Sequence, residues 1–447
     1  MKQHTVKTLK WLGIVAVVLA IAYAILAFAA NRSLSRAYAA LETDGRPIEL
    51  EGIIPPKIPD SDNAALVYRR VVLQLKAEKA ENGGEKSLWD ALSEVPADAK
   101  KQANPDDPAP ELVERFKQLY YHPVVVEALA DLEAGSRKSG YRNNLDYSKG
   151  FYMEVPHLGE LRSLTKILCY HARFQAAAGN HADAWNSILT ALRVADAMKD
   201  EPFLVTQLSR AAQLRMVVDA IQDLPSNAAI PAEADALLAA GENPAPWAAA
   251  MAGELIICEE YAFLITQSER RMLISQLMSP DGVIARPSRV GVFLYVIIEP
   301  LSRFDHAAHI TNMQGMAREM LKPYSEEGVE AIRQQRHQLP WYCMLTRMMI
   351  PIPLFERVRT KQIELAAQIR VTRAGLAVLQ HREEEGTWPD ALPKKADLAD
   401  PFTGEPLLYR PGSDGFVLYS VGANGVDDNG TPGKDRAGDI VWKYSAE

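Results

Sequence analysis

The residues best suited to binding a ligand lie in a glycine-rich loop near the C-terminus, between Gly422 and Gly438. Calcium takes six to eight hard oxygen ligands in flexible geometry, often including backbone carbonyls. The loop offers the carbonyl of Ser420 or Val421, and it offers side-chain oxygens from Asn424, Asp427, Asp428, Asp435 and Asp439. A cation would offset the repulsion in this cluster, so the pattern predicts a possible calcium site. The spacing is not that of an EF-hand, and a solvated acidic loop held by glycine and asparagine turns explains the same residues.

Two histidines form a second candidate for metal chemistry. His306 and His309, in the run Asp305-His306-Ala307-Ala308-His309, fall one turn apart on a predicted helix. Metal ligands use that spacing, but it is also common by chance, and the sequence shows no third ligand nearby.

Nothing else in the sequence forms a recognised catalytic pattern. Cys258, beside Glu259 and Glu260, is not a known nucleophile setting. Cys169 and Cys343, like Cys258, lie far apart in apolar helical contexts, which favours buried thiols over a disulfide or a metal site. The sequence has no nucleophile elbow, zinc-protease motif, Walker loop or dinucleotide loop. Whether the protein is an enzyme stays open, and the absence of a motif favours a non-catalytic role.

The spacing of apolar residues predicts the helix and the strands around the acidic loop. A long apolar stripe at helical spacing follows Pro353 and predicts a helix that ends near Gly386. The pattern then alternates with a period of two. It predicts strands at 406–410 and 416–421, joined by a turn at 411–415, and a third strand at 439–444.

This C-terminal segment resembles the C-terminal half of the major pseudopilin of type II secretion. The resemblance covers about the last 90 residues. It rests on these positions: Gly386-Thr387-Trp388-Pro389, Leu392, Asp400-Pro401-Phe402, Gly404, Pro406-Leu407, Tyr409, 418–425 and Gly438-Asp439-Ile440. In that family the acidic loop holds a calcium ion, so the resemblance implies a long helix packed on a small sheet, a calcium loop and a link to a secretion apparatus.

The chain as a whole also resembles a group of uncharacterised membrane-anchored bacterial proteins with the same ending. That resemblance rests on Asn63-Ala64-Ala65, Pro156-His157-Leu158 and Glu201-Pro202 as well as on the C-terminal segment. It implies no function.

The N-terminal segment predicts a membrane anchor. Residues 11–30 carry no charge and would cross a hydrocarbon core of about 30 Å as one helix. Lys2, Lys7 and Lys10 precede it, which places the N-terminus in the cytoplasm and the body on the far, periplasmic side of the inner membrane. A cleaved signal peptide is the alternative, because 27–29 has the form of a cleavage site, but the apolar run is long for one. A pilin would carry an acidic residue here, and this segment has none.

These elements predict a mainly α fold of four parts. A cytoplasmic tail at 1–10 and the anchor at 11–30 precede a helical body at 45–350. A pseudopilin-like long helix and β-tip then occupy 351–447. We expect an extended segment at 45–62, antiparallel helical hairpins in the body, and a buried helix or strand at 290–298 that ends at Pro300. The hairpin at 157–198 is similar to a tetratricopeptide unit, but no such period recurs, so a generic hairpin is preferred.

Two function classes remain. The net charge of −8 argues against a nucleic-acid-binding protein. The preferred hypothesis is a structural or interaction component of the cell envelope, bound to the membrane and to envelope protein partners. The alternative is an envelope hydrolase or ligand-binding protein with dispersed site residues. A pocket with convergent ionisable side chains favours the alternative, and a smooth helical array with an apolar groove favours the first class.

Overall fold

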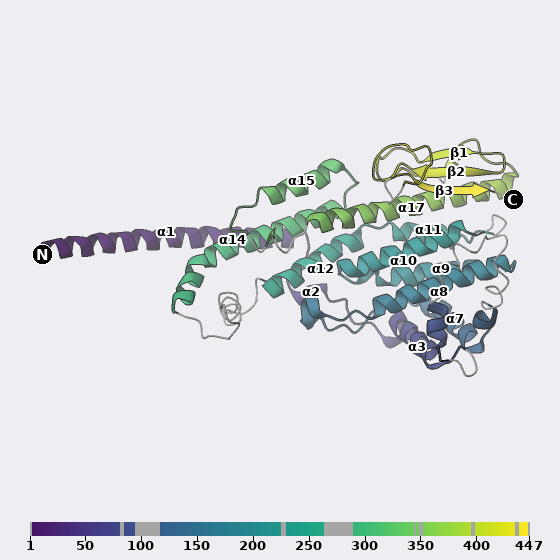
Figure 1. The fold of residues 1–447 in the computed structure, drawn as a ribbon, viewed down its shortest axis with the longest axis horizontal. Helices are drawn as coiled ribbons and strands as arrows, with labels where there is room; N and C mark the ends of the chain where they lie inside the picture. Colours follow the sequence, from purple (N-terminus) through teal and green to yellow (C-terminus); the bar gives the residue numbers. More distant parts are fainter. Residues whose placement is uncertain are drawn as a thin grey trace.

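The computed structural model describes residues 2–80, 85–93, 117–224, 229–262, 289–343, 346–347, 352–394, 398–433 and 438–445. The chain forms an elongated helical body with a small sheet at one end and a projecting N-terminal helix at the other (Figure 1). The prediction of a mainly α fold with a C-terminal three-stranded sheet is confirmed.

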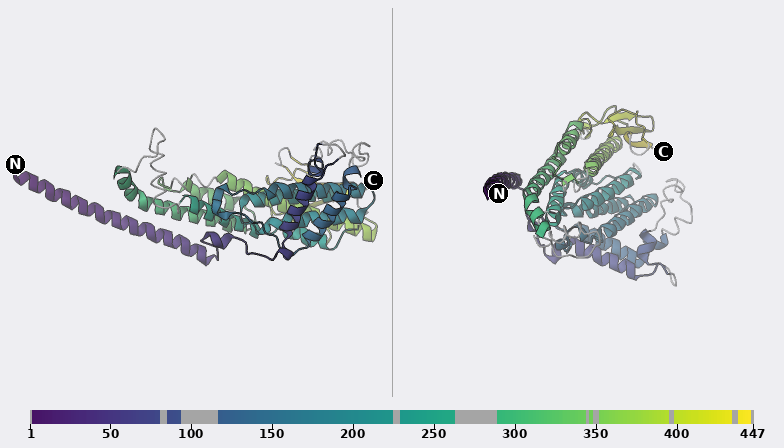
Figure 2. Two further views of the ribbon diagram at one scale, coloured as in Figure 1. Left: turned by 90° about the horizontal axis from the view of Figure 1, so that it is seen from below. Right: turned by 60° about the vertical axis from the view of Figure 1, so that its left-hand side comes forward.

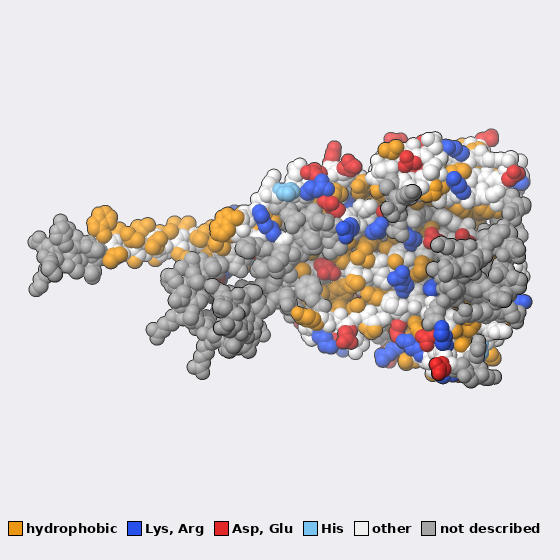
Figure 3. All heavy atoms as spheres, viewed as in Figure 1, with side chains coloured by type: hydrophobic (Ala, Val, Ile, Leu, Met, Phe, Trp, Pro, Cys, Tyr) orange, Lys and Arg blue, Asp and Glu red, His pale blue; other side chains and the backbone are white. Residues whose placement is uncertain are grey.

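The N-terminal helix α1 runs from Lys2 to Thr43 without a break. Its charge-free part stands away from the body, where large apolar side chains such as Phe28 are exposed (Figure 3). Among the described residues, the part of α1 from Lys10 to Thr43 is long and apolar enough to cross a membrane. An anchor and a signal sequence both fit that description.

The second part of α1 belongs to the body, because it packs along helix α14 (Arg289–Met320). Arg303 bonds to Asn31, the Tyr38 hydroxyl lies 3.3 Å from His306 Nε2, and Arg318 Nε donates to Asp44 at 2.7 Å. In these three pairs the residue numbers rise along α1 and α14 in the same order, so the two helices run parallel.

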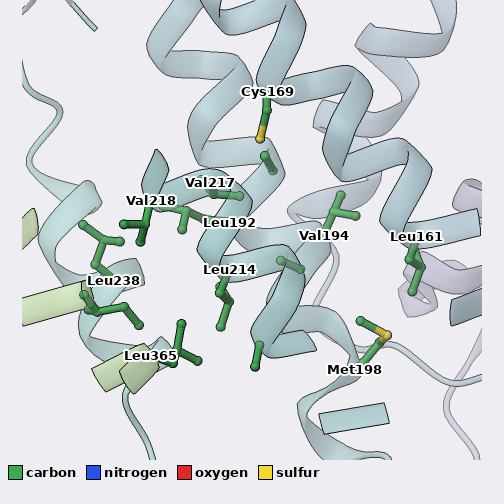
Figure 4. Packing of buried hydrophobic residues seen from close by; sticks show 14 of the residues in the cluster. Leu161, Cys169, Leu192, Val194, Met198, Leu214, Val217, Val218, Leu238 and Leu365 are labelled. Carbon is green, nitrogen blue, oxygen red and sulfur yellow. The ribbon is translucent and has the colours of Figure 1, made fainter. Parts of the chain in front are cut away.

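The centre of the body is a stack of helices that lie side by side (Figures 1 and 2). Its hairpin of α8 and α9 turns at Gly179, whose positive φ of 79° suits glycine. Apolar side chains of α8, α9, α10, α11 and the C-terminal helix α17 (Ile352–Glu385) meet in one core, which includes Leu161, Leu192, Leu214, Leu238 and Leu365 (Figure 4). The helices are α3 (Ala64–Ala77), α4 (Leu88–Ser93), α7 (Pro123–Ser136), α8 (His157–Ala177), α9 (His181–Asp196), α10 (Leu204–Gln222), α11 (Glu233–Gly241) and α12 (Ala245–Ala262).

The C-terminal unit consists of a long helix and an antiparallel sheet. Helix α17 (Ile352–Glu385) packs on β2 and β3 of a sheet whose strand order is β1-β2-β3. The strands are β1 (Leu408–Pro411), β2 (Gly415–Ser420) and β3 (Ile440–Ser445), each within two residues of its predicted bounds. Phe416 of β2 links the strands, because its ring centroid lies 5.5 Å from those of Trp442 and Tyr444 in β3 and 6.1 Å from that of Tyr409 in β1.

Two expectations differ from the structure, and one helix was not expected. The stretch 290–298 is helical, but the predicted end at Pro300 was wrong, because α14 continues through that proline to Met320. The segment 45–62 is not wholly extended, since it contains the short helices α2 (Leu50–Ile53) and η1 (Asp60–Asp62). Helix α15 (Glu326–His337) was not predicted. The apolar spacing of 246–278 also predicts a helix, which α12 confirms as far as Ala262, and the rest lies outside the described residues.

Candidate functional site

Two buried carboxylates organise the acidic loop and the turn beside it. Asp439, at 4% exposure, accepts the backbone N–H of Asp428 at 3.3 Å and that of Gly430 at 2.7 Å. Asp400, at 2% exposure, does the same for the neighbouring turn, where it accepts from Val421 N and Phe402 N at 2.9 Å. These two carboxylates bind peptide groups and so fix the shape of the loop.

Asn424 and Asp427 are exposed at the surface of the loop, and Asp428 is half-buried. Asp427 accepts from the Tyr419 hydroxyl at 3.0 Å and from Asn429 N at 2.8 Å, and Asn424 donates to Asp428 at 3.0 Å. Asp435 lies outside the described residues. The structure therefore brings Asn424, Asp428 and Asp439 close together. Within the described ranges, no group of three or more His, Cys, Asp or Glu side chains is placed to hold a metal ion.

The histidine pair of α14 lies in the body's interior. Asp305 accepts from Thr346 N at 3.1 Å, His306 meets Tyr38, and His309 is fully buried. Burial lowers the pKa of His309 to about 3, so its imidazole is neutral at pH 7. The three cysteines are buried thiols, as predicted.

The body contains a pocket that the sequence did not reveal. It has a volume of about 440 Å³ and opens between α3, the start of α8 and the connecting segment 141–157. Its wall combines apolar, aromatic and ionisable side chains: Tyr68, Arg69, Leu73, Tyr141, Asn143, Asp146, Lys149, Glu154, His157 and Glu160 are among them.

A buried glutamate fixes the polar wall of this pocket. Glu201, at 4% exposure, accepts from His157 Nε2 at 2.9 Å, Asn143 Nδ2 at 3.0 Å and Thr206 Oγ1 at 3.2 Å. Asn143 also donates to the Tyr141 hydroxyl at 2.5 Å. Burial, and next the charge of Glu201, raises the pKa of Tyr141 well above its ordinary value. That phenol is therefore a hydrogen-bonding group and not a base.

The segment that carries Asn143 is tied to the helices by Asn63. The Asn63 side chain caps α3 by accepting Ala65 N at 3.1 Å. It also pairs with the backbone of Arg142, accepting from its N–H at 3.0 Å and donating to its carbonyl at 2.9 Å. One asparagine thus starts α3 and positions the pocket wall.

The arrangement suits reversible binding or proton transfer. Its bond to Glu201 fixes the orientation of the His157 imidazole, and the pocket supplies charges of both signs. The lining side chains that the structure describes include no serine, threonine or cysteine, so the hydroxyl groups of this wall are the phenols of Tyr68 and Tyr141.

Sequence reasoning missed this pocket because its polar core joins Asn143, His157 and Glu201, which are far apart in the chain. One signal existed, since Asn63, His157 and Glu201 all belong to the short motifs of the whole-chain resemblance. Comparisons of the chain with protein families, curated proteins and solved structures find no match.

Proposed function

We propose that this protein is a membrane-tethered ligand-binding protein of the cell envelope, and that the pocket between α3 and α8 is its binding site. The observation that carries the proposal is this pocket of about 440 Å³ with a hydrogen-bonded polar wall. Small-molecule sites have volumes of roughly 300–1,000 Å³ and combine apolar walls with a few fixed polar groups. Convergent ionisable side chains are the feature that favours the ligand-binding alternative over a smooth interaction surface.

The charges of the lining suggest the ligand's class. Arg69 and Lys149 are cationic, whereas Asp146 and Glu154 are anionic. The fifth charged group, Glu160, is paired with Lys76 at 2.8 Å. A small zwitterion, such as an amino acid or a short peptide, would complement both signs, and the apolar body of Leu73 or Tyr68 would contact its side chain.

The proposed location follows from the N-terminal segment. The lysines before the apolar span favour a cytoplasmic N-terminus, which would place α1 in the inner membrane and the pocket in the periplasm.

A ligand panel with two neighbouring arginine variants tests the proposal. The purified full-length chain in detergent is heated with the natural amino acids and with di- and tripeptides, and the melting temperature is recorded. A bound ligand raises it by mass action. The Arg69→Glu variant should lose the shift. The Arg70→Glu variant should keep it, because Arg70 binds Asp131 at 2.8 Å and does not line the pocket. No shift with any panel member, or equal shifts in both variants, contradicts the proposal.

A second candidate is a structural or interaction component linked to a pseudopilus-like secretion system. Its support is the packing of α17 on β2 and β3 beside a folded acidic loop, the arrangement that the resemblance to the major pseudopilin implies. In this proposal Asn424, Asp427, Asp428, Asp435 and Asp439 supply a calcium site with a carbonyl of Ser420 or Val421.

Calcium should then raise the melting temperature of the protein. The double variant Asp427→Ala with Asp428→Ala should abolish the shift, and Asp428→Asn should weaken it with little change in shape. Asp414→Asn is the matched control, because Asp414 is an exposed acid in the β1–β2 turn, outside the loop. A wild-type protein that calcium does not stabilise rules out the site. For the envelope role, affinity capture from solubilised membranes should recover a defined envelope partner.

A further inference from the structure

The end of the body that faces the apolar span of α1 carries a second apolar element. We propose that the start of α14 inserts into the bilayer beside α1, in the leaflet on the body's side, with Trp341 and Tyr342 at the lipid surface. The protein would then contact the membrane at two places.

The bond between Arg303 and Asn31 sets the level of the membrane surface. Asn31 directly follows the charge-free span of residues 11–30, and Arg303 lies beside it on the parallel helix. Val290 lies thirteen residues before Arg303, which is about 20 Å of helix at 1.5 Å per residue. The first turns of α14 reach past the end of α12, on the side of the body from which α1 emerges (Figure 1). A helix that enters there reaches the depth of one leaflet without crossing a core of about 30 Å.

The sequence of this stretch suits lipid. Val290 to Ile298 contains no charged residue, and its only side-chain hydroxyl is that of Tyr295. Every face of the helix is therefore apolar, so the inference does not depend on how the helix is rotated. Backbone groups in a helix are already hydrogen-bonded, which makes a helix the form in which a chain enters hydrocarbon.

An independent observation comes from the aromatic residues at the same level. Phe304 adjoins Arg303 in sequence, and its ring lies 6.1 Å from that of Tyr342, which in turn lies 5.8 Å from Trp341. Trp341 is 76% exposed, more than any other large apolar side chain described. Tryptophan and tyrosine are enriched where a protein meets the membrane surface.

The bilayer is the occupant that the structure favours over a second protein chain. The apolar stretch 290–298 lies at the same height as the charge-free span 11–30 of α1. Arg32 and Arg36 are exposed just beyond this span, where lipid phosphates would lie.

Photocrosslinking in vesicles tests the proposal on the full-length chain. Vesicles of phosphatidylcholine and phosphatidylglycerol carry a phospholipid with a photoreactive group in its acyl chain, and adducts are mapped by mass spectrometry. We expect adducts in 290–298 as well as in 11–30, and none in α15. Adducts confined to α1 would overturn the proposal.

A reciprocal experiment distinguishes lipid from a second copy of the chain. A photoreactive amino acid replaces Leu294 or, as the control, Leu321, which is 49% exposed at the other end of α14. Position 294 should yield a lipid adduct and position 321 should not. A crosslinked dimer through position 294, with no lipid adduct, refutes the proposal and assigns the segment to a protein contact.

Discussion

Removal of the Glu201 carboxylate tests the central interaction of the pocket. Glu201→Ala leaves three donors without their acceptor: His157 Nε2, Asn143 Nδ2 and the Thr206 hydroxyl. An unsatisfied buried donor costs about 1–3 kcal/mol. The threonine hydroxyl can rotate to another acceptor, which leaves two donors and a range of about 2–6 kcal/mol.

Access to water narrows the expected cost of Glu201→Ala. His157 and Asn143 both line the pocket, so water can reach them once the carboxylate is gone. We therefore expect the lower half, a loss of about 2–4 kcal/mol in the free energy of unfolding. Glu201→Gln should cost less, because the amide keeps an acceptor oxygen, but its NH₂ must face one of the donors.

The assay is denaturant unfolding of the full-length protein in detergent, followed by tryptophan fluorescence. Leu73→Ala is the control, since Leu73 lines the same pocket but is 57% exposed and should change stability by less than about 0.5 kcal/mol. A cycle of His157→Ala and Glu201→Ala should show a coupling of about 0.5–3 kcal/mol. Wild-type stability in Glu201→Ala, or strictly additive losses in the cycle, would refute the account of Glu201 as the acceptor that holds the wall.

Two further predictions concern the packing and the pH response. Gly375→Ala should destabilise the protein by about 1–3 kcal/mol despite the better helix propensity of alanine, because the new Cβ would lie 2.1 Å from the ring of Trp442, which is 3% exposed. In thermal unfolding, the double variant Gly375→Ala with Trp442→Leu should recover part of the stability that Trp442→Leu and Gly375→Ala together would otherwise lose. A Gly375→Ala variant that is more stable than the wild type would contradict the close packing of Gly375 on Trp442. Burial lowers the pKa of His171 to about 4, below an unfolded value of about 6.5. The folded chain then binds fewer protons in this window, so stability should fall by up to about 3 kcal/mol as the pH falls from about 6.5 to 4. In His171→Gln the melting temperature should depend less on pH over that range. An unchanged pH dependence would count against the lowered pKa of His171.

Most of the fold could be predicted because strand alternation, helix caps and glycine breaks each depend on a few neighbouring residues. The alternation of Ile440, Trp442 and Tyr444 defines a strand whose Trp442 is buried and packs against α17. The cap at Asn63 and the break at Gly179 depend on one side chain or one φ angle and need no distant contact. The continuation of α14 through Pro300 was not predictable in this way. Proline opposes a helix interior, and here the packing of α14 on α1 and α12 overrides that local preference.

The candidate site was harder to predict because it depends on pairing across the chain. Glu201 meets His157 only after α8, α9 and α10 have packed, and the sequence around it, Asp200-Glu201-Pro202, looks like an exposed turn. The acidic loop was visible because its residues are contiguous. The loop sequence did not reveal that the Asp439 carboxylate would bind backbone N–H groups while Asp427 stays at the surface.

The unbroken course of α1 joins its apolar part and the body into a single rigid piece. A rigid helix of 42 residues is about 63 Å long, and at a tilt of ~20°, typical of membrane helices, its end moves sideways by about 20 Å. No flexible joint separates Ala30 from the part of α1 that packs on α14. In the proposed arrangement, with the apolar part of α1 in a bilayer, a thinner or thicker bilayer would change the tilt of this helix. The pocket and the β-tip would then swing through an arc above the membrane.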